Sequence, residues 1–248
     1  MPSSSETVER LLGRVSVRSF TDATVSEETV EAILRAAVRA PTSSNIQAYS
    51  IIVVRDAHVK QLLAAAVGNQ ARVAACPVFL AFCADLTRIE HAMAGGGLHL
   101  DDNNLEMGLV SSIDASLVGM SAYLAAETLG LDGVMIGAVR NDPPRIAELL
   151  ELPRRVYCVF GMCLGVAETV PPQKPRMALD AVVHHERYSV TDPAAQVAAY
   201  DDALAAHYRS QGRKTNDSSW SQEIIDKFSV RPRDRLRQQL AELGFDFS

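Results

Sequence analysis

The sequence is poor in cysteine, and the spacing of the few cysteines gives no sign of a metal site. Its 248 residues include four, Cys76, Cys83, Cys158 and Cys163, each lying singly in an apolar run. None belongs to a CxxC pair, and no histidine stands near them at the spacing of metal ligands. We expect buried, reduced thiols, as in the reducing cytoplasm, and no bound metal.

Long apolar runs and an excess of positive charge are also absent. The longest nearly apolar run, residues 73–84, is too short to cross a bilayer, and the N-terminal MPSSSETVER has no apolar signal segment. The formal net charge is −6, which gives a polyanion no general electrostatic reason to bind. We therefore expect a cytoplasmic protein that binds neither nucleic acid nor a membrane.

What is present is an ordinary globular composition with 48% hydrophobic residues, enough to build a sizeable core. No repeat and no long linker divides the chain, so we predict a single domain over residues 1–248 with a C-terminal excursion at about residues 190–248. Apolar periodicity, caps and breakers predict strands and helices. The strands are expected at residues 49–54, 77–84, 134–139 and 156–164, and the principal helices at residues 7–12, 26–37, 58–67, 113–129 and 193–208, from 143 onward, and around 236–243.

A polar loop, residues 41–47, joins the second of these helices to the first strand. Its sequence PTSSNIQ offers short hydroxyl and amide side chains, which let a flat polar ligand approach the backbone closely. Gln70, just past a helix end, could reach the same ligand. An ordinary helix-to-strand loop would carry the same residues, so both interpretations stay open here.

Two basic sets could hold an anion. Arg14, Ser16 and Arg18 alternate along an extended segment and would point to one side. Lys174 and Arg176 stand two residues apart in a proline-stiffened loop and would also point the same way. Charge-assisted hydrogen bonds from such groups suit a phosphate, although solvated arginines on an exposed edge would give the same pattern. By contrast, the glycines of residues 95–97 lack the Lys and Ser/Thr of a phosphate-binding loop, and residues 93–104 are expected to form a flexible loop.

The helix expected at residues 113–129 is apolar on more than one side, with Asp114 and Glu127 as its only charges. A helix of this kind is normally buried. A second copy of the same chain would cover it most simply, so we expect a homodimer.

Several blocks in one order resemble the nitroreductase family of FMN-dependent oxidoreductases, in particular its flavin reductase P and oxygen-insensitive major nitroreductase subgroup. The blocks are SVRSFTD (16–22), APTSSNIQ (40–47), FCADL (82–86), AETLGLDGVMIGAVRND (126–142), FGMCLG (160–165) and KPR (174–176). The resemblance implies an α+β fold, with a mixed, mainly antiparallel sheet flanked by helices, in an intertwined homodimer with FMN at the subunit interface.

The resemblance also implies the cofactor-binding residues. It assigns the FMN phosphate to Arg14, Ser16, Arg18, Lys174 and Arg176, and it places Ile136, Gly137 and Ala138 along the ring. Around the ring and the ribityl chain it places Thr42, Ser43, Ser44, Asn45, Gln47 and Gln70. The flavin itself carries hydride from a nicotinamide to a second substrate, so no side chain is expected to be catalytic.

Departures from the family pattern affect both the flavin and the nicotinamide. Val15 stands where a basic residue commonly precedes the serine, and Ala138 replaces a usual glycine beside the ring. Gln211 and Asn216 occupy positions at which NADPH-preferring members have arginines. Arg213 and Lys214 lie nearby, and we expect them to bind the substrate, with NADPH favoured over NADH.

The sequence therefore predicts an NAD(P)H-dependent FMN oxidoreductase that reduces a small-molecule acceptor: a nitroaromatic, a quinone or free flavin. Two alternatives stay open. One is a flavin reductase that supplies FMNH2 to a partner monooxygenase, and the other is a module that binds flavin without turning it over.

Overall fold

A computed structural model of the chain describes residues 5–100, 105–189, 192–212, 219–230 and 232–247. The chain forms two compact units. The larger unit comprises Met1–Pro171 with Arg233–Ser248, and the smaller one comprises Pro172–Pro232. The expectation of a single domain with a C-terminal excursion stays a prediction.

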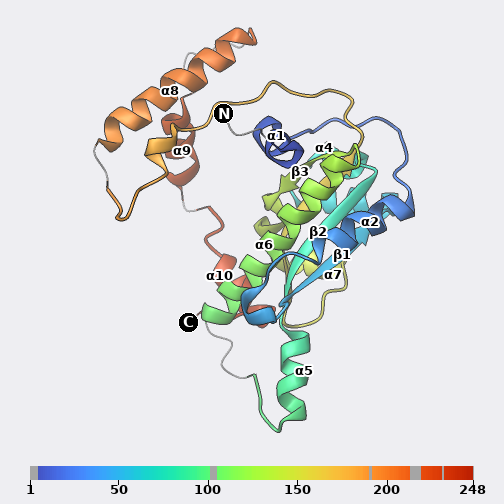
Figure 1. Cartoon of the computed structure of the whole chain (residues 1–248). Helices are drawn as coiled ribbons and strands as arrows, with labels where there is room; N and C mark the ends of the chain where they lie inside the picture. The colour runs from blue at the N-terminus through green and yellow to red at the C-terminus, as the bar shows by residue number, and fades with distance from the viewer. Residues whose placement is uncertain (1–4, 101–104, 190–191, 213–218, 231, 248) are drawn as a thin grey trace. The chain divides into compact units, whose positions relative to one another are not determined.

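A four-stranded sheet forms the centre of the larger unit (Figure 1). Its strands are β1 (Tyr49–Val54), β2 (Val78–Asp85), β3 (Asp132–Ile136) and β4 (Val156–Gly165), in the spatial order β1-β2-β4-β3. All three pairings in the described residues are antiparallel. Every residue of β2 is buried, because helices cover both faces of the sheet. The expected α+β fold with a mainly antiparallel sheet is confirmed.

Side chains that alternate along β2 enter two separate cores. Leu80 and Phe82 pack with α2 and α6, whereas Phe79 and Cys83 pack with α3, α4 and α7. All four cysteines are buried and unbridged, as the sequence predicted.

The helices of the larger unit are α1 (Glu6–Gly13), α2 (Glu27–Ala37), α3 (Ala57–Ala66), α4 (Ala71–Ala75), α5 (Thr87–Gly95), α6 (Leu105–Thr128), α7 (Pro143–Leu149) and α10 (Leu236–Glu242), with 3-10 turns η1 (Ser43–Asn45) and η2 (Gly137–Asn141).

The helix caps that the sequence indicates are present. The Ser26 hydroxyl accepts the Thr29 N–H at 3.1 Å at the start of α2, and the Asp142 carboxylate accepts the Arg145 N–H at 3.3 Å before Pro143 begins α7. Such caps satisfy backbone donors that have no partner inside the helix.

Helix α6 begins eight residues earlier than predicted, at Leu105 rather than Ile113. It is the one helix in the described residues that is long and apolar enough to cross a membrane, but half of its most apolar 18-residue window is buried inside the protein. One side, with Ala115, Val118 and Ala122, packs in the core. The helix is therefore a core element of the larger unit.

The smaller unit contains the 3-10 turn η3 (Leu179–Ala181) and the helices α8 (Pro193–Ser210) and α9 (Trp220–Phe228). The Asp201 carboxylate on α8 accepts the N–H of Ser221 at 2.9 Å and its hydroxyl at 2.5 Å, which joins the two helices.

The prediction of a loop at residues 93–104 is wrong for 93–95, which lie in α5, and residues 101–104 lie outside the described part of the chain.

Gly133, in β3, has no room for a side chain. A Cβ atom there would lie 2.6 Å from the Cys163 carbonyl oxygen and 2.8 Å from Leu164 Cδ2. Because that oxygen belongs to the neighbouring strand, it cannot move away without disturbing the sheet. We expect Gly133→Ala to lower the free energy of unfolding by about 2–3 kcal/mol in a urea titration.

The control for this prediction is Gly13→Ala, because nothing lies within 4 Å of a Cβ atom at Gly13. That surface change should alter the free energy of unfolding by no more than about 0.5 kcal/mol. Equal urea midpoints for the two variants would contradict the packing argument.

Candidate functional site

The polar loop between α2 and β1 has an unusual backbone. Ser44, Asn45 and Gln47 have φ angles of 46°, 57° and 56°, in the left-handed region. Non-glycine residues seldom adopt this region, and each such residue costs on the order of 1–3 kcal/mol unless its surroundings enforce the conformation. The concentration of such residues in one loop marks it as a candidate site.

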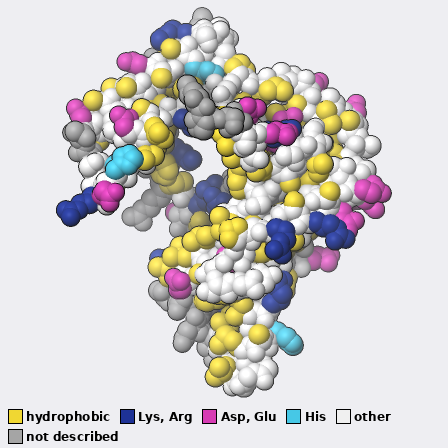
Figure 2. Space-filling model, in the orientation of Figure 1, with side chains coloured by type: hydrophobic (Ala, Val, Ile, Leu, Met, Phe, Trp, Pro, Cys, Tyr) yellow, Lys and Arg dark blue, Asp and Glu magenta, His cyan; other side chains and the backbone are white. Residues whose placement is uncertain are grey.

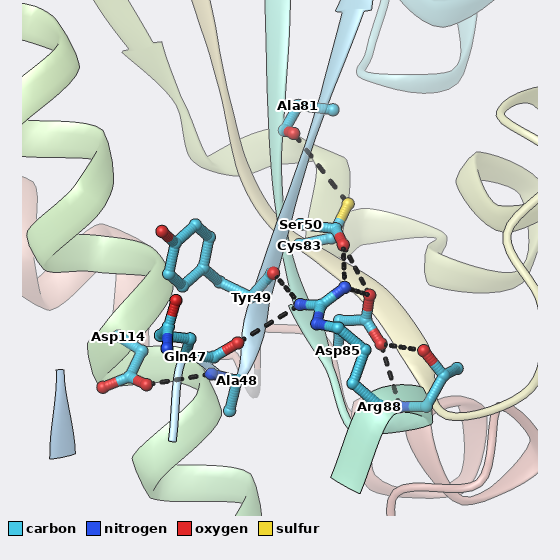
Figure 3. A network of polar contacts seen from close by, with 10 residues as sticks. Gln47, Ala48, Tyr49, Ser50, Ala81, Cys83, Asp85, Arg88 and Asp114 are labelled. Carbon is cyan, nitrogen blue, oxygen red and sulfur yellow. Dashed lines mark hydrogen bonds and ion pairs between the residues drawn. The ribbon is translucent and has the colours of Figure 1, made fainter. Parts of the chain in front are cut away.

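Two charged side chains of the larger unit hold this loop (Figure 3). Asp114 on α6 is fully buried, and its two carboxylate oxygens accept the N–H groups of Ser43 at 2.9 Å and Ala48 at 3.1 Å. On the other side, Arg88 donates to the carbonyl oxygens of Gln47, at 3.2 Å, and of Tyr49. Nothing in the sequence alone pointed to a role for either charged residue.

Asp85, at the end of β2, orients Arg88 by an ion pair of 3.1 Å. Burial raises the pKa of Asp85, but hydrogen bonds from Ser50 and Thr87, together with the charge of Arg88, bring it below its ordinary value. The carboxylate is therefore ionised at neutral pH, and it keeps the guanidinium directed at the loop.

The side chains of Ser43, Ser44, Asn45 and Gln47 are exposed, and Thr42 is half-buried. The Gln47 amide nitrogen donates to the Asn45 carbonyl oxygen at 3.1 Å. The structure thus brings the predicted loop residues together on one surface, where their donors and acceptors are open to a ligand.

The segment that carries Arg14, Ser16 and Arg18 is fixed by the buried Val17, whose N–H donates to the Gly133 carbonyl oxygen at 3.0 Å. Tyr123 on α6 donates its hydroxyl to the carbonyl oxygens of Val15 at 2.7 Å and Gly133 at 2.8 Å. Val17 is therefore buried while Arg18 is exposed, and the convergence of Arg14, Ser16 and Arg18 on one anion stays a prediction.

The two arginines of this segment have different surroundings. The Arg14 guanidinium lies 5.1 Å from the centre of the Tyr123 ring. Burial raises the pKa of Glu127 above its ordinary value, and the charge of Arg14 opposes that shift. Arg18 donates to the Ser16 carbonyl oxygen at 3.1 Å and has no carboxylate partner among the described residues. Arg18 is therefore the more available of the two for an anion.

Arg72, on the short helix α4, is a further cation that sequence reasoning missed. Burial first, and then the nearby charge of Arg72, lower the pKa of Arg18. Within the described residues the Arg72 guanidinium has no hydrogen bond or ion pair. Gln70, at the N-cap of α4, donates its side-chain amide to the Val67 carbonyl oxygen at 3.0 Å. Two guanidiniums without a carboxylate partner thus lie near each other, an arrangement that favours an anion.

The predicted ring-facing residues lie where β3 ends. Ile136 is buried, and Gly137 and Ala138 begin η2. Arg233 donates to the Gly137 carbonyl oxygen at 3.3 Å, and burial, followed by the charge of Arg140, lowers the pKa of Arg233. Sequence reasoning also missed these two arginines.

The separation between the polar loop and the basic segment follows from the residues of helix α6 that each of them contacts. Asp114 holds the loop, and Tyr123, nine residues later, holds the segment of Arg14 and Arg18. At 1.5 Å per residue this is about 14 Å along the helix axis. Within one copy of the chain the two sets therefore lie beside different turns of α6.

In the smaller unit, Lys174 donates to the Tyr208 hydroxyl oxygen at 2.8 Å, and Tyr200 donates to the Pro175 carbonyl oxygen at 3.1 Å. Two tyrosines of α8 thus hold the loop that carries Lys174 and Arg176, and both cations are exposed. Their convergence with Arg18 on one phosphate stays a prediction. Arg213 and Lys214 lie outside the described residues.

Comparison with known proteins agrees with this architecture. The chain matches the nitroreductase family over residues 11–166 and the C-terminal domain of that family over residues 174–248. It is 35% identical to an FMN reductase (NADPH) of Bacillus subtilis, covering 98% of this chain and 99% of the relative. It is 38% identical to an oxygen-insensitive NADPH nitroreductase of Salmonella typhimurium, covering 89% and 90%.

Among solved structures, the hypothetical oxidoreductase YcnD from Bacillus subtilis superposes with a TM-score of 0.95 at 33% identity, over 99% of this chain and 100% of that one. The fold is thus α+β, and the family match and these relatives place the chain in a class of NAD(P)H-dependent oxidoreductases. The chain belongs to the nitroreductase family.

Proposed function

We propose that this protein is an FMN-dependent NAD(P)H oxidoreductase that reduces nitroaromatics, quinones or free flavin, with NADPH as the favoured donor. The observation that carries the proposal is similarity along nearly the whole chain to relatives named FMN reductase (NADPH) and oxygen-insensitive NADPH nitroreductase. When bound, FMN supplies the hydride chemistry, accepting hydride from a nicotinamide and passing it to a second substrate in turn.

The residues of this chain suit the two ends of FMN. For the phosphate we propose Arg14, Ser16, Arg18, Lys174 and Arg176, with Arg72 as an additional cation that offsets the missing basic residue at Val15. For the ring and the ribityl chain we propose Thr42, Ser43, Ser44, Asn45, Gln47 and Gln70, with Ile136, Gly137 and Ala138 along the ring. The exposed hydroxyls and amides of the loop support this assignment. These groups bind and orient, and none of them has to transfer a proton for hydride to move.

We also propose that the protein works as a cytoplasmic homodimer. The outer side of α6 exposes an apolar stripe, in which Leu109, Ile113, Leu117 and Met120 are each 37–55% exposed. These residues recur at helical spacing and form one stripe, and Figure 2 shows hydrophobic side chains on this face. A stripe this continuous is typical of an interface. Pairing α6 with its own copy would bring the polar loop of one subunit toward the basic segment of the other.

An anaerobic reduction tests the proposed function. The protein is loaded with FMN, NADPH is added under argon, and the visible spectrum is recorded. We expect the yellow oxidised spectrum to bleach and then to return when a nitroaromatic or a quinone is added. An oxidised spectrum that persists with both NADPH and NADH would refute the proposal.

The relative named FMN reductase favours a second candidate function, the supply of reduced flavin to a partner monooxygenase. Steady-state rates with free FMN and with nitro compounds distinguish the flavin reductase from an enzyme that reduces nitroaromatics. Turnover of added FMN far above that of any nitro compound would select the flavin reductase.

A further inference from the structure

One peptide group in the polar loop is held at both of its ends. The peptide between Gln47 and Ala48 presents its carbonyl oxygen to Arg88 at 3.2 Å and its N–H to Asp114 at 3.1 Å. A rotation of this peptide would break both bonds at once. The left-handed φ of Gln47, 56°, is adjacent to this fixed peptide. Opposite charges on two different elements therefore lock its orientation.

The other oxygen of Asp114 secures the beginning of the loop by accepting the Ser43 N–H at 2.9 Å. Asp114 is fully buried and forms no ion pair within the described residues. An isolated buried carboxylate is costly unless hydrogen bonds compensate for its lost hydration. Here the compensating donors are the two backbone N–H groups at the ends of the loop, so burial of Asp114 and the conformation of the loop depend on each other.

The side chains inside the locked segment pack little against the rest of the protein. Ser43, Ser44, Asn45, Ile46 and Gln47 are all exposed, and their polar groups are not needed to complete the core. Three left-handed residues are therefore maintained without a packing benefit from their own side chains. Strain of this kind, kept in place by its surroundings, is a mark of a binding surface that is organised in advance.

We propose that Asp114 and Arg88 are positioning residues for FMN: without touching the flavin, they fix the Gln47–Ala48 peptide and hold the loop in its flavin-binding shape. The inference rests on the proposed function. It adds two residues from α5 and α6 that act through the backbone. Because Asp114 also lies beside Ile113 of the exposed stripe on α6, the same helix would link subunit pairing to the shape of the loop.

The test compares three variants by FMN affinity, measured by flavin fluorescence, and by the two-electron reduction potential of the bound flavin. Asp114→Asn leaves one acceptor oxygen and presents an NH2 group to the other backbone N–H. Arg88→Met removes the donors on the half-exposed side, where folding is least at risk. We expect both Asp114→Asn and Arg88→Met to weaken FMN binding at least about tenfold and to shift the reduction potential, whereas the third variant is a control.

The matched control is Ser111→Ala, on the same helix. Ser111 is fully buried, and within the described part of the chain its hydroxyl bonds only to carbonyl oxygens of α6, those of Met107 at 2.7 Å and Gly108 at 3.2 Å. This variant should keep the wild-type affinity and potential, even if its unfolding temperature falls.

The outcomes separate this inference from the proposed function. Wild-type protein that binds no FMN would overturn the proposed function, and this inference with it. If wild-type protein binds FMN while Asp114→Asn and Arg88→Met keep its affinity and potential, only the positioning role is wrong. Lower unfolding temperatures alone, with unchanged flavin properties, would likewise assign the two residues a merely structural role.

Discussion

Replacing Arg18 and Arg176 together with alanine is expected to strip the protein of FMN. A charge-assisted hydrogen bond contributes about 1.5–3 kcal/mol, so losing two independent ones should weaken binding by roughly 10²–10⁴-fold. Both guanidiniums are exposed, and neither has a carboxylate partner among the described residues. Flavin that remains with the protein after gel filtration gives a direct measurement, and a fluorescence titration gives the dissociation constant.

The control variant should lose the same number of positive charges at positions outside the proposed phosphate site. Arg35 and Arg145 form exposed ion pairs with Glu31 and Glu148 on their own helices. Their double alanine variant also loses two cations, but we expect it to retain FMN, since surface pairs of this kind contribute little to stability. Unchanged flavin retention in Arg18→Ala/Arg176→Ala would rule out the phosphate assignment.

Single substitutions of Arg72 and Arg14 test how much each cation contributes to binding the FMN phosphate. We expect Arg72→Ala to weaken FMN binding about tenfold, the equivalent of one charge-assisted bond. Arg14→Ala should have a smaller effect, because the Arg14 guanidinium already faces the Tyr123 ring and lies near Glu127. A larger loss for Arg14 than for Arg72 would contradict the order of availability that the structure suggests.

The parts of the fold that the sequence predicts well are those that local chemistry decides. The strands β1, β2 and β4 are nearly continuous apolar runs, and their expected bounds agree with the structure to within a residue. The third strand ends at Ile136 rather than Val139, because η2 begins at Gly137. The chain turns into a 3-10 helix there while Val139 stays buried, so an apolar run alone could not locate the end of the strand.

Three of the short helices, α4, α5 and α9, escaped prediction, whereas α1, α7 and α10, of seven or eight residues, were found from caps, breakers or apolar spacing. Helix α4 has five residues, and α5 and α9 have nine each. Isolated helices of this length are marginal in water, and tertiary packing supplies most of their stability. The sequence of α4 therefore carries little signal, although the helix determines where Gln70 and Arg72 lie.

Some residues of the candidate site can likewise be found from the sequence, and others cannot. The loop of residues 42–47 could be found because its hydroxyl and amide side chains are consecutive. Asp114 could be seen only as one of two charges in an apolar helix, since its partners Ser43 and Ala48 are 71 and 66 residues away. Arg88 and Arg72 likewise act through space. Left-handed backbone at Ser44 and Gln47 has no sequence signal, because neither is a glycine or an asparagine.

Leu117→Glu is expected to separate the proposed homodimer into monomers. Leu117 lies in the exposed stripe of α6 and is 39% exposed in the single chain. Because both subunits contribute the same residues to a two-fold interface, each substitution changes two side chains there. Fully burying a leucine contributes about 1.5–3 kcal/mol, so burying the exposed 39% of two copies of Leu117 contributes roughly 1–2.5 kcal/mol, about tenfold to fiftyfold in the dimer dissociation constant. Burying two unpaired glutamate carboxylates in their place adds several kcal/mol more against the dimer. Sedimentation velocity at micromolar protein should then show monomers.

Loss of the dimer should also release FMN, because the polar loop and the basic segment of one copy lie beside different turns of α6. In our proposal the two subunits complete each flavin site together, so flavin retention should fall in step with the dimer fraction as protein is diluted. Leu117→Met is the matched control, since it keeps an apolar side chain of similar volume and should remain dimeric and yellow. A Leu117→Glu protein that sediments as a dimer would place the interface away from this stripe. A monomer that holds FMN as tightly as the wild type would show that one chain alone provides both ends of the site.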